Sequence, residues 1–377
     1  VVMYKSFKIR LYPTKEQEIL FKKHIGCCRF IYNYMLDLQN KNYEAGNKYI
    51  SKFNMIKLLT SLKKTGEFCW LGEVARHSLV IACEDLDSAF KGFFSKISRY
   101  PKFKSKHKSR LKFPVRAESM YFKSDIFINI EKCGKVKYKS DFRFPIGSHV
   151  CKFVNTRIED KNGKWILSFA VEYENQVQNT NDFSMGIDLG IKELAVVSCN
   201  NQEYVFHNIN KSKKMRDIEK RIRYVQRSMD RKYRQNKEHT NNWERERQKL
   251  RRLCAKQTNI RDNYLHQTTR FLVNLLPNRV VMESLDIASM MKNKYLAKEI
   301  AEQKWYEFTR QMQYKCEWAG IKFVKVDQYY PSSKTCSHCG HIKKDLKLSD
   351  RVYVCTVCGL EIDRDLNAAK NLEKYIA

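Results

Sequence analysis

The stretch "MGIDLGIKELAVVS", residues 185–198, has the composition of two short buried strands joined by a tight turn, but an acidic residue interrupts the first apolar run. That residue is Asp188, and Gly190 follows it two positions later. Burying a carboxylate among apolar side chains is costly unless the group is paired or coordinates a cation. Asp188 could therefore be a capping or ion-paired residue, or it could belong to a metal site.

A second apolar run, "VVMESLDI" at residues 280–287, repeats this arrangement, with Glu283 at the end of the predicted strand. A third acidic group is Asp363 and Asp365, at the start of a predicted helix. Carboxylate oxygens are ligands of Mg²⁺, and two ions about 4 Å apart can activate a water and stabilise the leaving oxygen in phosphodiester hydrolysis. These acids predict a nuclease-type metal site, although spacing alone does not choose between Asp363 and Asp365.

Two cysteine pairs lie between the second and third acidic groups. They are Cys336-x2-Cys339 and Cys355-x2-Cys358, separated by 15 residues. Two such knuckles hold four thiolates at the corners of a tetrahedron, which predicts one structural Zn²⁺ with no position left for water. A redox role, or replacement of one ligand by His338 or His341, is the alternative. The other nine of the 13 cysteines lack motif spacing, which suits a reducing compartment.

The net charge points to a polyanionic partner. Lys and Arg number 72 and Asp and Glu 41, which gives a formal charge of +31. A field of that size attracts nucleic acid most commonly, and a solvated basic surface or an acidic membrane are the alternatives. No apolar run approaches the roughly 18 residues that span a bilayer, and the first residues lack the apolar core of a signal peptide. We expect a cytoplasmic, nucleoid-associated protein without a membrane partner.

Two segments concentrate this charge. Residues 91–116 contain ten Lys or Arg and no acid, interleaved with aromatic residues, and residues 211–256 contain 18 Lys or Arg against six acids. In the second segment Ile218, Ile222 and Val225, followed by Met229, keep helical spacing, which predicts a basic helical hairpin. A solvated linker and a coiled coil with a solvated face are the alternatives. The candidate nucleic-acid contacts are Lys102, Lys104, Lys106, Lys108, Arg110, Arg221, Arg227 and Arg231.

The rest of the chain alternates between helical and strand-rich regions. Residues 3–11 have strand periodicity, and Thr14 with Gln17 forms a capping-box pattern that opens a helical block reaching about residue 97. Residues 119–180 contain several strand-like runs, which predict a small sheet or barrel that the N-terminal strand could join. A polar linker at residues 175–182 predicts a domain boundary. The fold class is α+β with several domains.

These motifs resemble those of one family. "GIDLGIKELAVVS", "VVMESLDI", "PSSKTCSHCG" and "CGLEIDRDLNAAKNL", together with the N-terminal "FKIRLYPTKEQE", "GCCRFIYNYML" and "YPKFKSK", are similar to the TnpB (OrfB) proteins of bacterial insertion sequences. Miniature type V CRISPR effectors are similar to them. The resemblance implies RNA-guided cleavage of DNA beside a short flanking motif. Its partners would be a guide RNA from the transposon end and double-stranded and single-stranded target DNA.

The resemblance also implies site residues and a domain layout. Asp188 matches the first RuvC acid and Glu283 the second, while Asn367 of the D-x-N-A-A stretch identifies Asp365 as the third and leaves Asp363 as a helix N-cap. The acids would hold Mg²⁺, as two ions. The implied domains are a β-barrel wedge module (1–13 plus 101–180), a helical recognition domain (14–100), a RuvC/RNase H-like nuclease domain (183–330 plus 360–377, with the hairpin at about 211–266) and a zinc-ribbon insertion (331–359).

Three other functions fit parts of the pattern. A non-catalytic RNA-guided DNA-binding regulator and a miniature type V effector share most of the motifs, and a transposase that joins DNA strands itself is the third. The presence of all three acids argues against the regulator. The lack of a His-hydrophobic-His arrangement argues against the transposase.

Overall fold

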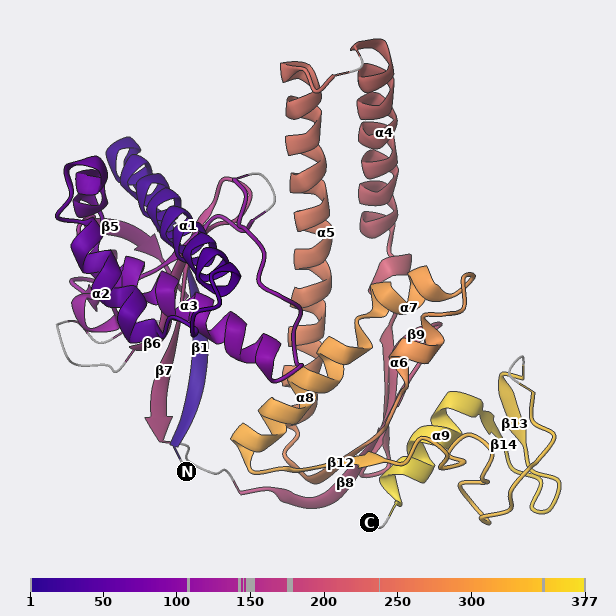
Figure 1. The fold of residues 1–377 in the computed structure, drawn as a ribbon. Coiled ribbons are helices and arrows are strands. Elements are labelled where there is room, and N and C mark those ends of the chain that lie inside the picture. Colours follow the sequence, from indigo (N-terminus) through magenta and orange to yellow (C-terminus); the bar gives the residue numbers. More distant parts are fainter. Residues whose placement is uncertain are drawn as a thin grey trace. The chain divides into compact units, whose positions relative to one another are not determined.

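The computed structural model describes residues 2–106, 109–141, 144, 146, 153–174, 179–236, 238–347 and 350–375, and Figure 1 shows the course of the chain. Lys108, one of the predicted nucleic-acid contacts, lies outside the described residues. The chain divides into two compact units, residues 1–175 and residues 176–377. Each unit has its own sheet and its own hydrophobic core.

The helices of the first unit follow the predicted helical block. They are α1 (Lys15–Glu44), α2 (Lys52–Leu62) and α3 (Arg76–Phe94), with a 3₁₀ helix, η1 (Gly66–Glu73), before α3. The predicted capping box is confirmed: the Thr14 hydroxyl accepts from the Gln17 backbone N–H, and the Gln17 side chain accepts from the Thr14 N–H. Apolar side chains at helical spacing, such as Phe21 and Ile31, are fully buried in the core.

The sheet of this unit has seven strands, in the order β2-β6-β7-β1-β5-β4-β3. Their bounds are β1 Val2–Tyr12, β2 Lys112–Pro114, β3 Tyr121–Phe122, β4 Phe127–Ile130, β5 Gly134–Lys139, β6 Phe153–Asp160 and β7 Trp165–Glu174. A short 3₁₀ helix, η2 (Ala117–Ser119), precedes β3. The N-terminal strand joins this sheet as predicted, because β1 pairs antiparallel with β7 and, at its end, with β5.

The prediction of a closed barrel is wrong. Within the described residues the end strands β2 and β3 do not pair with each other. They have only three and two residues and pair with β6 and β4, so their outer edges offer few hydrogen bonds with which to close the sheet. The sheet curls nevertheless, because the Phe122 ring of β3 lies 5.9 Å from that of Phe153 in β6 and 6.0 Å from that of Phe169 in β7. Aromatic packing fills the concave face while the backbone edges stay open.

The second unit is built on a five-stranded sheet in the order β10-β9-β8-β11-β12. The strands are β8 (Asn181–Leu189), β9 (Glu193–Cys199), β10 (Gln202–His207), β11 (Pro277–Glu283) and β12 (Lys322–Val326). Strands β8, β9 and β10 form an antiparallel meander. On the other side of β8, β11 pairs with it in parallel, and β12 pairs in parallel with β11. The quoted stretch 185–198 therefore provides the centre of the sheet.

The two faces of this sheet are covered differently. Met185 and Ile187 of β8 and Met282 of β11 join a core with side chains of α5 (Asn241–Asn274) and α8 (Trp305–Ala319). Alternate residues point to the other face, which α9 (Arg364–Glu373) covers. At Gly186 an added Cβ would lie 2.0 Å from the Ala369 carbonyl oxygen, so only glycine lets α9 sit this close to β8.

The predicted basic hairpin is confirmed. Helices α4 (Lys213–Asn236) and α5 pack against each other, and Figure 1 shows them side by side as a long pair. Ile218 and Val225 are buried between them, and Ile222 and Met229 are half-buried. The hydrophobic spacing of α4 therefore marks its contact with α5, and its charged residues face outward.

The remaining short elements belong to the second unit. They are η3 (Ile209–Lys211), α6 (Ile287–Met290), α7 (Ala297–Gln303), β13 (Val352–Val354) and β14 (Glu361–Asp363). Strands β13 and β14 pair within the segment that contains the four cysteines. In the part of the chain that the structure describes, none of the helices combines the length and apolarity needed to traverse a bilayer.

Candidate metal centres and nucleic-acid interface

Asp188 and Glu283 occupy neighbouring positions at the ends of two parallel strands. Ile187 of β8 is the register partner of Met282 of β11, and each acid is the next residue along its strand. Because Ile187 and Met282 face the core under α5 and α8, the two acids point to the opposite face. The register therefore brings the first two predicted acids together on the α9 side of the sheet.

Asp365 reaches the same place from α9. Gly186 lies against Ala369 and Glu373 near the end of α9, whereas an added Cβ on Gly190 would be 4.0 Å from the Asp365 carboxylate oxygen Oδ2. The helix therefore runs along β8 in the opposite direction. Its first turn, which contains Asp365, lies at the end of the strand that contains the other two acids.

The charges of these acids act on one another. Burial raises the pKa of Asp188 well above its ordinary value of 3.8, and the neighbouring carboxylates of Glu283 and Asp365 raise it further, against an opposing effect of Arg364. The pKa of Asp365 is also raised, chiefly by burial and then by Asp363. Each of the three acids keeps part of its surface exposed. The raised pKa values reflect acidic groups close to one another, and a divalent cation would stabilise their ionised forms.

The three carboxylates are a donor set that suits a divalent cation. In the described part of the chain, the four cysteines are the one group whose ligand atoms are gathered closely enough to hold a metal ion. Binding of Mg²⁺ by the acids stays a prediction. Three carboxylates are also the hard oxygen donors that Mg²⁺ selects.

Asp363 has a different task from Asp365. Its carboxylate accepts from the backbone N–H groups of Asp365 at 2.9 Å and Leu366 at 3.2 Å, so it is the N-cap of α9. The prediction that Asp363 caps the helix is confirmed. One oxygen of Asp363 is thus held by backbone donors, and the assignment of Asp365 as the metal-binding acid of this pair stays a prediction.

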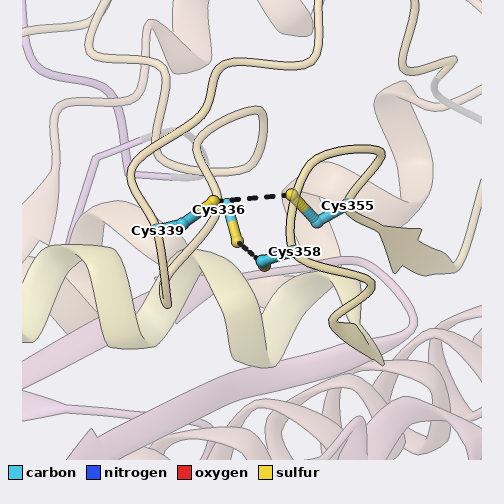
Figure 2. A group of neighbouring side chains, drawn as sticks. All are labelled: Cys336, Cys339, Cys355 and Cys358. Atoms are coloured by element: carbon cyan, nitrogen blue, oxygen red, sulfur yellow. Dashed lines mark hydrogen bonds between the residues drawn. The ribbon is translucent and has the colours of Figure 1, made fainter.

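The four cysteines form a separate centre (Figure 2). The Sγ atoms of Cys336 and Cys358 lie 3.6 Å apart, as do those of Cys339 and Cys355, and all four lie within 4.8 Å of one another. A tetrahedron with Zn–S bonds of about 2.3 Å has edges of about 3.8 Å, so this group fits a structural Zn²⁺. No position remains for a reacting water.

The two knuckles have the same backbone geometry. Gly340 and Gly359, each directly after the second cysteine of its pair, have φ of +77° and +73° and donate to the carbonyls of Cys336 and Cys355. This left-handed turn favours glycine. His341 contributes its backbone carbonyl, which accepts from the Cys336 N–H, and neither His338 nor His341 belongs to the ligand group. The predicted grouping of the four cysteines is confirmed, and their binding of zinc stays a prediction.

Proteins of known family match almost the entire chain. A protein of Escherichia coli K12 assigned as RNA-guided DNA endonuclease InsQ is 31% identical over 384 residues, which cover 97% of this chain and 91% of that relative. A Streptomyces pristinaespiralis protein assigned as an RNA-guided DNA endonuclease is 30% identical over 98% of this chain and 88% of its own length. The chain belongs to the TnpB (OrfB) family. The expected family resemblance is therefore confirmed.

Family models describe parts of this TnpB chain. Residues 168–294 match the OrfB_IS605 model, described as "Probable transposase", and residues 305–372 match the "Cas12f1-like, TNB domain" model. Residues 3–48 match a model described as a helix-turn-helix domain, although here they form β1 and the single long helix α1.

CRISPR effectors are more distant relatives of this TnpB chain. The Cas12f1 endodeoxyribonuclease of Sulfoacidibacillus thermotolerans is 27% identical over 57% of the chain and 51% of its own length. A solved Cas12f1–sgRNA–target DNA complex aligns over 99% of both chains at 18% identity with a TM-score of 0.38. A score that low supports no conclusion about function.

The sequence did not reveal the polar residues that join the two centres of this TnpB protein. The Ser332 hydroxyl donates to Glu283 Oε1, and the Asn371 side chain donates to the carbonyls of Ser332 at 2.7 Å and Thr335 at 2.6 Å. Asn367 donates to the Thr335 carbonyl at 2.7 Å and accepts from the backbone of residue 337 at 2.9 Å. The segment 332–337 is thus held between Glu283 and α9. The sequence did offer one signal for these contacts: Asn367 and Asn371 lie four residues apart, on the face of α9 that is buried.

The predicted nucleic-acid contacts differ in exposure. Lys102, Lys106 and Arg110 are exposed in the first unit, and Arg221, Arg227 and Arg231 are exposed on α4. Lys104 is half-buried, with its Nζ 3.5 Å from the centroid of the Tyr32 ring. Their contacts with nucleic acid stay a prediction.

Proposed function

We propose that this TnpB protein is an RNA-guided DNA endonuclease of a transposable element, and that Asp188, Glu283 and Asp365 form its Mg²⁺-dependent active site. The observation that carries the proposal is the meeting of these acids, from segments up to 177 residues apart, at one end and on one face of the central sheet. The names of relatives that match nearly the whole chain support RNA guidance and DNA cleavage.

The strand order supports a RuvC-like, RNase H-type nuclease domain. If the five strands β8 to β12 are numbered 1 to 5 along the chain, their order across the sheet is 3-2-1-4-5. The first three are antiparallel, and the last two add in parallel to the first. Asp188 and Glu283 lie at the carboxyl ends of strands 1 and 4, which are β8 and β11. Ligands of open α/β sheets bind beyond the carboxyl ends of the strands. The position of the acids agrees with that rule.

The residues would divide the work as follows. Bound Mg²⁺ would supply a hydroxide nucleophile and stabilise the leaving oxygen. Asp188, Glu283 and Asp365 would hold the ions, with Asp188 beside Glu283 through the register of β8 and β11. Ser332 holds one oxygen of Glu283 and so orients its carboxylate. Asp363 holds the first turn of α9, which sets the position of Asp365.

We assign the other parts by charge and by family. The helices at residues 14–100 and the curled sheet module at 1–13 plus 101–180 would hold guide RNA and read the flanking motif. The hairpin within the nuclease domain (183–330 plus 360–377) would contact the backbone of the RNA–DNA duplex. The ribbon at 331–359 would brace the site through structural zinc. The guide RNA would come from the transposon end.

The substitution Asp188→Ala tests the active site. We expect the rate of DNA cleavage with Mg²⁺ to fall at least about 1,000-fold, since a lost metal ligand removes several kcal/mol of transition-state stabilisation. Binding of the co-purified RNA and of matching DNA should persist. The matched control is Glu317→Ala, which removes an exposed carboxylate far along α8.

The outcome separates the nuclease from its rival. Equal cleavage by the Asp188→Ala and wild-type proteins would refute the assignment of the site. RNA-dependent DNA binding by the wild-type protein, with no cleavage at any Mg²⁺ concentration, would favour the RNA-guided regulator.

A further inference from the structure

A cationic pocket lies in the first unit, whereas the acids and the cysteines belong to the second unit. It has a volume of about 230 Å³ and is lined by residues of α1, α3, β2 and β6 and of the segment before β2. Its apolar lining includes Ile25, Cys28, Ala82 and Pro114. At about 30 Å³ per water molecule, the volume is that of roughly seven or eight waters. This gives room for a phosphate group and part of a sugar.

The lining carries a large excess of positive charge. The cationic side chains are Arg29, Lys104, Arg110, Lys112 and Arg157, and the one acid is Asp85. Asp85 is already used, because it binds Arg157 through two hydrogen bonds of 3.0 and 3.3 Å. Among the residues that the structure describes, the other four cations have no ion-pair partner. Five cations and one acid leave a formal charge of +4.

Two of these cations are held in place before any ligand arrives. The Lys104 backbone N–H and C=O both bind the Asn33 side chain, at 2.8 and 2.9 Å, and its ammonium lies over the Tyr32 ring. Burial lowers the pKa of Lys104, so its charge is poorly solvated and gains from an anion. Arg157 is fixed by its paired bonds to Asp85. An anion that enters the pocket therefore meets preorganised donors.

We infer that this pocket binds one backbone phosphate of the RNA partner, at a point where the RNA strand turns sharply, with the adjoining sugar against the apolar lining. The choice of RNA rests on the proposed function. A recessed site reaches a phosphate only where the nucleotide protrudes, and folded RNA offers such nucleotides at bulges and loops. Regular duplex DNA presents its phosphates on a convex surface and would reach only the rim.

The test uses the full chain, freed of nucleic acid, and an RNA hairpin of about 40 nucleotides with a 4-thiouridine-labelled bulge. The variant is Arg110→Ala with Lys112→Ala, and the control is Lys322→Ala with Lys325→Ala on β12, to which no RNA contact is assigned. All four residues are exposed, so each double variant should fold and each loses the same charge. Circular dichroism checks the fold.

We expect the RNA to cross-link to peptides containing residues 25–29 or 109–114. The pocket variant should lose this cross-link, bind the RNA about tenfold more weakly and show a salt dependence shallower by about 1.5 to 2 in log Kd per log salt. The control should keep the cross-link and at least half of the affinity.

Three results would overturn the inference. They are an equal loss in the control variant, no cross-link in the pocket, and a DNA hairpin of the same sequence that cross-links there as well as the RNA does. The readout does not depend on cleavage. A protein that cross-links RNA in the pocket and never cleaves DNA would refute the proposed nuclease and leave the pocket standing.

Discussion

The close approach of α9 to β8 gives the sharpest test of how the fold positions the acids. The substitution Gly186→Ala adds one methyl group at a position where an ideal Cβ would lie 2.0 Å from the Ala369 carbonyl oxygen and 2.3 Å from the Glu373 backbone nitrogen. Ordinary contact begins at 3.4 Å. The helix must therefore retreat by about 1.4 Å, the difference between these two distances, because backbone atoms cannot rotate away.

The energetic cost follows from this displacement. Overpacking of a well-packed core costs about 1–3 kcal/mol, and a clash with helix backbone belongs at the upper end, so we expect a loss of about 3 kcal/mol. Amide exchange in β8 and α9 should then accelerate about 100- to 200-fold. Since Asp365 moves with α9, a displacement of about 1 Å should slow DNA cleavage about 100-fold.

Hydrogen exchange with mass spectrometry measures the first effect, and single-turnover cleavage measures the second. The matched control is Gly26→Ala in α1, where no atom lies within 4 Å of an added Cβ. Alanine inside a helix is more stable than glycine by about 1 kcal/mol, so this variant should be as stable as the wild type or more so. Wild-type exchange and cleavage by Gly186→Ala would show that α9 does not position Asp365.

Three further predictions concern the two centres. We expect elemental analysis to find about one zinc ion per wild-type chain. Cys355→Ser should lose this zinc, whereas Cys254→Ser, which changes an exposed cysteine outside the group, should keep it. Without added Mg²⁺, Asp188→Asn should raise the melting temperature at pH 8. The pKa of Asp188 is raised by folding, so its ionised form destabilises the fold above the ordinary value of 3.8, and the advantage of Asn should vanish as the pH falls towards 4. A constant advantage across this range would contradict the assignment of the shift to Asp188. Asn371→Ala should cost about 2 kcal/mol in urea denaturation, because the buried Ser332 carbonyl loses its donor and the Thr335 carbonyl keeps only that of Asn367. A chelator should then remove zinc faster. An unchanged rate of zinc release would show that Asn371 does not support the ribbon.

Local spacing was sufficient for the features that short segments form by themselves. The capping box at Thr14 and the cysteine knuckles each depend on residues within a few positions of one another. The hairpin is similar, since the periodicity of Ile218 and Val225 marks one face of a helix irrespective of its partner. Such patterns can be read because their geometry follows from backbone periodicity alone.

Local spacing could not predict whether the sheet of the first unit closes into a barrel. Strand periodicity predicts strands but does not say whether the first and last strands are long enough to pair. Here the edge strands β2 and β3 are short, and contacts of Phe122 with rings on distant strands curl the sheet without closing it. Those contacts exist only after the chain has folded.

The sequence by itself determined the types of ligand and their order along the chain: acids at strand ends, four cysteines in two knuckles, and an excess of positive charge. Only the tertiary structure decided that Asp188, Glu283 and Asp365 share one face, because this depends on the register of β8 with β11 and on the space that Gly186 leaves for α9. It also decided that Ser332 and Asn371 connect the cysteine segment to Glu283. The physical reason is that side-chain type is local, whereas convergence requires strand pairing and helix packing between segments far apart in the chain.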